Sequence, residues 1–343
     1  MKSKNPTKAS SGIIAALVIA ALCFSASTWA SDEELKFTIA TEAGDRESPN
    51  GQAVKKIADL VEKQSDGRIT MNVFYQDEIG GPQELFDQLV RGNIDLFLGW
   101  PQTSYDERLG VLQLPYMTLG WEDALDAYAK DGWVSEVVEP ILSDIGLEYL
   151  GPFPEGFGGI ATAETYATNY EDAQGIKLRS QPIFPLPQTI QAMGFQAVPI
   201  DWSEVYTSIQ TGVVDGDSSN VIFWDYTYFN DLLDYFVHSK HNFSFYTFLM
   251  NQNSWKALDD EDRGIIAGAV EVVVNEQFQN AKAEDEKWIQ KAQEDGMKYV
   301  VPSDEEMAAW VKRVRETVWV EAEETMGEEV MAAVREHASD PSK

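Results

Sequence analysis

The stretch from residue 175 to residue 224 constrains the fold of this chain most, because short apolar runs alternate along it with helical segments. A strand–helix–strand–helix–strand order is typical of an α/β domain. In open α/β sheets, ligands bind beyond the carboxyl ends of strands, where Arg179, Trp202 and residues 217–220 stand. A binding site is therefore predicted here. The expected elements are a strand at 175–179, a helix at 185–193, a strand at 195–200, a helix capped by Asp201 and Glu204, and an apolar run at 213–214.

The first third of the chain has the same alternation. Because 343 residues exceed one ordinary hydrophobic core, two lobes are expected. A long helical segment with few breakers follows at 259–294. The early elements are expected as strands at 35–41, 68–75 and 94–100 and helices at 50–64 and 82–91.

Residues 1–30 have the features of a secretory signal peptide. Three lysines precede an apolar run at 12–24, and a small-residue cleavage pattern ends at Ala30. The apolar run is short for a membrane span, and an uncleaved anchor is the alternative. We therefore expect a periplasmic protein whose mature chain begins at Ser31.

Composition excludes several classes of function. The net charge of −31 repels nucleic acid and anionic lipid, so no nucleic-acid partner is expected. This acidity fits either adaptation to high salt or an acidic functional patch. Cys23, the only cysteine, lies inside the expected signal peptide, which excludes disulfides and thiolate chemistry from the mature chain. No nucleotide-binding, nucleophile or metal-ligand motif is present, so neither a cofactor nor a metal is predicted.

A family signature runs through the central stretch. The segment G-I-K-L-R at 175–179 is followed by P-x-x-x-x-E-V-Y-x-x-x-Q-T-G-V-V-D-G at 199–216. This order and spacing resemble the solute-binding subunits (DctP type) of TRAP transporters, the tripartite ATP-independent periplasmic transporters. The resemblance implies a two-lobed periplasmic binding protein fold of the α/β class, with mixed sheets flanked by helices and a long helix spanning both lobes. It also implies that Arg179 forms a bidentate pair with a solute carboxylate.

The resemblance implies a mechanism and a set of partners. A small solute would close the hinge between the lobes, and the closed monomer would deliver it to the TRAP membrane permease subunits. The expected parts are a signal peptide at 1–30, lobe I at 31–156 and 241–258, lobe II at 157–240 and 297–343, and the long helix at 259–296.

Departures from the family pattern bear on the solute. Glu42 stands where many members have asparagine, Gly158 where many have a second arginine, and residues 217–220 read D-S-S-N in place of Q-E-N-P. The first two changes make the cleft less positive, and an acid in a closing cleft requires a cation or hydrogen-bond donors. Similarity to ectoine-binding members, which use a glutamate and aromatic rings, suggests an amine-bearing or zwitterionic solute such as ectoine, a betaine-like compound or an amino alcohol. The predicted ligand-binding residues are Arg179, Glu42, Trp202, Asp217, Trp224, Trp100, Phe243, Phe245 and Ser219.

Other functions remain open at this point. A small monocarboxylate could bind Arg179 while Glu42 and Asp217 point away or pair internally. A periplasmic hydrolase could use the same two acids as general acid and base, although no motif supports an enzyme. A purely structural periplasmic protein would bind no metabolite.

Overall fold

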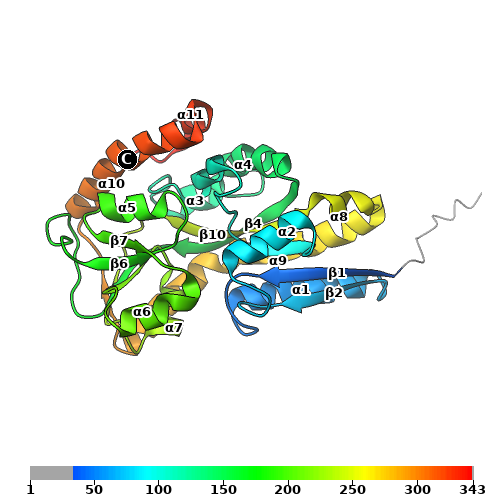
Figure 1. The fold of residues 1–343 in the computed structure, drawn as a ribbon, viewed down its shortest axis with the longest axis horizontal. Coiled ribbons are helices and arrows are strands. Elements are labelled where there is room, and N and C mark those ends of the chain that lie inside the picture. The colour runs from blue at the N-terminus through cyan, green and yellow to red at the C-terminus, as the bar shows by residue number, and fades with distance from the viewer. Residues whose placement is uncertain (1–33, 342–343) are drawn as a thin grey trace, which may run out of the picture. The chain divides into compact units, whose positions relative to one another are not determined.

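The computed structural model describes residues 34–341, so the expected signal peptide at 1–30 lies outside the described residues. Its first sheet has the strand order β2-β1-β3-β10-β4. β1 pairs in parallel with β2 and β3, whereas β10 is antiparallel to β3 and β4 (Figure 1). The sheet is therefore mixed, as expected. Its strands are β1 (Leu35–Thr41), β2 (Ile69–Phe74), β3 (Leu96–Gly99), β4 (Leu147–Phe157) and β10 (Phe243–Asn251).

The second sheet has the order β11-β9-β5-β8-β6-β7 and contains the central stretch. β6 pairs in parallel with β7, as the strand–helix–strand pattern predicts. The last strand begins later than expected, at Gly216, and Val213 is exposed. The strands are β5 (Ile160–Thr162), β6 (Lys177–Ser180), β7 (Gln196–Pro199), β8 (Gly216–Ser218), β9 (Tyr235–Val237) and β11 (Lys298–Val300).

Helices cover both sheets, and most lie where the sequence predicts them. Ser48 caps α1 by accepting a hydrogen bond from the Gly51 amide, and the apolar positions of this helix are buried against β2 and α9. The expected capping box at Asp201 and Glu204 is absent, because the Asp201 side chain makes no capping hydrogen bond. The helices outside the C-terminal region are α1 (Pro49–Gln64), α2 (Pro82–Arg91), the 3-10 helix η1 (Glu107–Gln113), α3 (Trp121–Ala127), α4 (Trp133–Asp144), α5 (Leu186–Ala192), the 3-10 helix η2 (Trp202–Glu204), α6 (Val205–Gln210), α7 (Ile222–Phe229) and α8 (Gln252–Ala257).

The long helix α9 (Asp260–Glu294) contacts elements of both sheets. It packs on β4 and α1 on one side of the fold and on α7 and β11 on the other. An ion pair also attaches it to the start of β2, where Arg68 Nη1 lies 3.0 Å from Asp262 Oδ2. The expected long helix that spans both lobes is thus confirmed.

The C-terminal helices α10 (Asp304–Met326) and α11 (Glu328–His337) join the two halves of the fold. Trp310 of α10 donates its indole N–H to the Met193 carbonyl in the second half, whereas Trp319 donates to the Pro115 carbonyl in the first. α11 then packs on α4, and its buried residues belong to the first half's core. This packing differs from the expected assignment of residues 297–343 to lobe II alone.

Two neighbouring segments connect the sheets. The first passes from β4 to β5 through Gly158, and the second passes from β9 to β10 at 238–242. The Gly158 amide donates to the Asn242 carbonyl, and a Cβ at Gly158 would lie 2.2 Å from Asn242 Oδ1. A side chain at this position would require the Asn242 side chain and the Ser219 backbone to shift. Within residues 34–341, no helix is long and apolar enough to cross a membrane.

Candidate ligand-binding site

A cavity of about 320 Å³ lies where the ends of the two sheets approach each other. This volume is within the range of small-molecule sites. The first sheet contributes residues at the ends of β1 and β3 and from β10, and the second contributes residues at the end of β6 and from the segment after β8. The lining side chains include Glu42, Gln83, Trp100, Gln102, Arg179, Gln181, Ile183, Asp201, Trp202, Asn220, Trp224 and Tyr246.

Contacts on the side away from the cavity hold the Arg179 side chain in place. It leaves β6 with only 2% of its surface exposed, and its Nε donates to the Ile200 carbonyl at 2.9 Å. Its Nη1 lies 3.3 Å from Oδ1 of Asp217, a fully buried residue of β8. The guanidinium carbon is 5.6 Å from the centre of the Trp202 ring. These contacts fix the direction of the guanidinium before a solute arrives.

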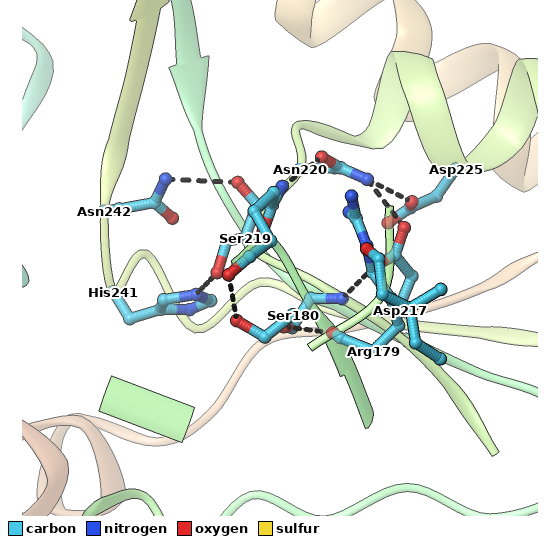
Figure 2. A network of polar contacts seen from close by, with 11 residues as sticks. Arg179, Ser180, Asp217, Ser219, Asn220, Asp225, His241 and Asn242 are labelled. Atoms are coloured by element: carbon cyan, nitrogen blue, oxygen red, sulfur yellow. Dashed lines mark hydrogen bonds and ion pairs between the residues drawn. The ribbon is translucent and has the colours of Figure 1, made fainter. Parts of the chain in front are cut away.

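Asn220 connects this ion pair to a second buried acid (Figure 2). Its Nδ2 donates to Asp217 at 2.8 Å and to Asp225 at 3.1 Å, while its Oδ1 accepts from Gln181 at 3.0 Å. Burial raises the pKa of both carboxyls, and the charge of Asp217 raises the pKa of Asp225 further. One guanidinium therefore faces two buried carboxyls, and it contacts Asp217 directly.

The carboxyl of Glu42 lies in the cavity wall and is not paired with any basic side chain that the structure describes. It follows β1, is 7% exposed, and accepts a hydrogen bond from the Trp100 amide through Oε1 at 2.8 Å. Within residues 34–341, its Oε2 has no hydrogen-bond partner, and neither do Trp100 Nε1 and Gln181 Oε1. Burial raises the pKa of Glu42 to about 8. Three buried polar atoms on residues of the cavity wall thus lack a hydrogen-bond partner in the described part of the chain.

Aromatic rings form much of the wall. Trp100 stacks on Tyr246 with ring centres 5.6 Å apart, and Trp202 meets Trp224 edge to face at 6.2 Å. The Trp224 indole N–H donates to Glu155 at 2.8 Å. Rings of this kind present negative faces to a cation and apolar surface to methylene groups. The site can therefore hold a small solute that has both charged and apolar parts.

Comparison with known proteins identifies the family to which this chain belongs. Residues 39–325 match the model of the bacterial extracellular solute-binding protein family 7, DctP. The chain belongs to this family. Among similar proteins, the ectoine-binding periplasmic protein TeaA of Halomonas elongata is 25% identical over 321 residues, 91% of this chain and 92% of TeaA. The C4-dicarboxylate-binding protein DctP of Rhodobacter capsulatus is 27% identical over 295 residues, 84% of this chain and 87% of that protein.

Solved structures of TRAP solute-binding proteins confirm the fold of this DctP-family member. The ectoine-binding protein of Halomonas elongata superposes with a TM-score of 0.81 at 22% identity, covering 88% of this chain and 98% of that one. A protein from Sulfurospirillum deleyianum with bound succinate gives a TM-score of 0.79 at 22% identity and covers 88% and 99%. The resemblance to TRAP solute-binding subunits is therefore confirmed, and these relatives are binding proteins rather than enzymes.

The structure of this DctP-family member brings together five of the nine predicted ligand-binding residues. The cavity is lined by Glu42, Trp100, Arg179, Trp202 and Trp224.

The other four lie elsewhere. Asp217 contacts Arg179 from behind, and Ser219 hydrogen-bonds His241 Nε2 at 2.9 Å near the connecting segments (Figure 2). Phe243 and Phe245 pack on Tyr128 in the core, because odd-numbered side chains of β10 point to that face. The expectation that these two phenylalanines line the cavity is therefore wrong.

Sequence reasoning missed several residues that line the cavity, and Tyr246 and Gln181 are the two that bear most on the site. Tyr246 lies on the opposite face of β10 from Phe245, so the two-residue period of the strand could have identified it. Gln181 follows β6 directly and carries an amide oxygen without a partner in the described part of the chain. Its position two residues after Arg179, just beyond the end of β6, could have identified it from the sequence.

Proposed function

We propose that this protein is the periplasmic solute-binding component of a TRAP transporter and that it captures an amine-bearing or zwitterionic organic solute. The observation that carries this proposal is the carboxyl of Glu42, which is buried beside Trp100 and lacks a partner for Oε2 among residues 34–341. An ammonium group placed there would satisfy the free oxygen and favour the ionised form of Glu42. Arg179 would bind the carboxylate of the same solute.

The charge balance of the cavity favours a solute that carries both signs. Asp217 neutralises part of the field of Arg179, and position 158 carries glycine rather than a second arginine. Trp100, Trp202, Trp224 and Tyr246 surround the space with rings that stabilise a cation and exclude water. A solute with one carboxylate and one cationic nitrogen, such as ectoine or a betaine-like compound, uses all of these groups.

A small monocarboxylate is the second candidate, and the pKa of Glu42 favours it. With a pKa of about 8, Glu42 is protonated at neutral pH and can donate a hydrogen bond to an anion. Solved relatives bound to glucuronate and galactonate show that sugar acids are solutes elsewhere in this fold.

Proton release distinguishes the two candidates. If a cationic nitrogen ionises Glu42, binding at pH 7 is expected to release about one proton per solute, because the pKa of Glu42 then falls below the working pH. A monocarboxylate that leaves Glu42 protonated releases none. Titration calorimetry in two buffers of different ionisation enthalpy measures this number for ectoine, glycine betaine, glucuronate and galactonate.

A binding screen and a Glu42 variant serve as controls for this experiment. A preceding thermal-shift screen selects the solutes that bind, since a ligand at a hundred times its Kd adds about 2.7 kcal/mol to the stability. Glu42→Gln is expected to abolish the proton release. A screen in which only acids without a cationic nitrogen respond would contradict the amine proposal.

Transport requires a change between an open and a closed form. Both sheets contribute lining residues to one cavity, so a solute that contacts both stabilises the closed arrangement by its greater affinity for it. The closed protein would then dock on the TRAP membrane permease. The hydrolase alternative loses its acid–base pair, because Asp217 is paired with Arg179 and does not line the cavity. The monomeric state stays a prediction that light scattering can measure.

A further inference from the structure

Glu155 occupies a bulge in the strand that leads from the first sheet to the second. On β10, Phe245 pairs with Pro154 and Ser244 pairs with Gly156, so Glu155 has no partner in the ladder. A bulge of this kind redirects the side chain of the extra residue and is frequent beside functional sites. Gly156 has a φ of 153° and no Cβ, and a Cβ there would lie 3.1 Å from Cγ of Asp285.

The carboxyl of Glu155 bonds two elements at once. Its Oε1 accepts from the Trp224 indole N–H at 2.8 Å, and its Oε2 accepts from the Ser244 hydroxyl at 2.7 Å. Trp224 belongs to α7 and lines the cavity, whereas Glu155 does not line it. On another side of the indole is Gly44, where an added Cβ would come within 3.1 Å of Trp224 Cη2. The indole is thus held between a carboxyl and the turn after β1.

We propose that Glu155 is a positioning residue that fixes the orientation of the Trp224 indole in the cavity wall, and that protonation of Glu155 loosens this wall. An ionised carboxylate accepts a shorter and stronger hydrogen bond from the indole than a neutral carboxyl does. The proposal rests on the proposed function only in that Trp224 is part of the solute-binding wall.

Burial is the main reason that this protonation falls in the neutral range. Burial raises the pKa of Glu155 to about 7, Asp285 on α9 raises it as well, and the hydrogen bonds from Ser244 and Trp224 lower it. Glu42 lies across the cavity wall, and its pKa is raised in turn by the charge of Glu155. Burial raises the pKa of Asp285 itself to about 7, and the charge of Lys240 offsets part of this rise.

The test needs no solute, so its failure is separate from a failure of the proposed function. Tryptophan labelled with ¹⁵N at the indole is incorporated into the ligand-free protein, and Trp224→Phe assigns the Trp224 resonance. We expect this indole N–H resonance to shift between pH 5.5 and pH 8.5 with a midpoint near 7. Glu155→Gln is expected to abolish the transition.

Two further variants sharpen the result. Ser244→Ala removes a hydrogen bond that lowers the pKa of Glu155, so the midpoint should rise by about one pH unit. Glu148→Gln changes a partly buried glutamate of the same strand and should leave the midpoint unchanged. A Trp224 resonance that does not titrate, or that titrates identically in Glu155→Gln or Ser244→Ala, overturns the proposal; the last comparison remains decisive if Glu155→Gln fails to fold.

Discussion

Replacement of Arg179 by alanine is expected to abolish solute binding and to lower the free energy of unfolding by about 3–5 kcal/mol, because it leaves a buried carboxylate without its counter-charge. The carboxylate is Asp217, which is fully buried 3.3 Å from the guanidinium. Arg179 lowers the pKa of Asp217, so its loss raises that pKa further. An acid with a raised folded-state pKa costs stability as the pH rises, and the deficit should therefore shrink on acidification.

Urea unfolding and calorimetric titration together measure this prediction. Arg179→Lys keeps the charge but loses the planar fork, so a carboxylate solute should bind about 10- to 100-fold more weakly while the fold survives. The control is Arg68→Ala, which breaks a less deeply buried ion pair with Asp262; neither of these residues lines the cavity. It should destabilise the protein without changing the affinity of the folded form. An unchanged affinity in Arg179→Lys would refute the role assigned to Arg179.

Replacement of Glu42 by glutamine is expected to remove a large pH dependence of stability. Burial raises the pKa of Glu42 from 4.5 to about 8, so the unfolded chain releases this proton at a lower pH than the folded protein does. The stability of the wild type should therefore fall as the pH rises from 4.5 to 8, by up to about 5 kcal/mol from this group. A glutamine can still accept the Trp100 amide hydrogen bond and does not ionise.

The measurement compares urea unfolding at pH 5 and pH 8.5. The difference in unfolding free energy between the two conditions should be several kcal/mol smaller in Glu42→Gln than in the wild type. Glu122→Gln, at an exposed position of α3, is the control and should follow the wild type. Equal pH dependence in Glu42→Gln and the wild type would mean that Glu42 is not held protonated by burial.

The sheets and the strand ends could be predicted because they depend on local pattern. The apolar runs of β6 and β7 and the glycine that ends α5 specify a parallel unit, and its geometry places Arg179 at a site edge. The roles of individual residues in β10 were harder to predict from the sequence. All nine residues of this strand are buried, and no polar alternation distinguishes its two faces. Phe245 and Tyr246 look equally suitable in sequence, but only Tyr246 points to the cavity.

Long-range pairing accounts for the remaining differences. The sequence places Asp217 in the site, but it does not show that β8 lies beside β6 and turns this acid toward Arg179 from behind. The bulge at Glu155 likewise depends on the register between β4 and β10, which no local motif specifies. Charge near a cleft was thus predictable, whereas the partner of each charge was not.

Helix α10 limits how the two halves can move. Trp310 binds one half and Trp319 the other, about 14 Å apart along the axis of a single rigid rod. Because a helix does not lengthen without losing backbone hydrogen bonds, these two attachment points keep a constant separation. The proposed opening would therefore be a pivot about the C-terminal rod, because pulling the halves straight apart would require one of the indoles to detach.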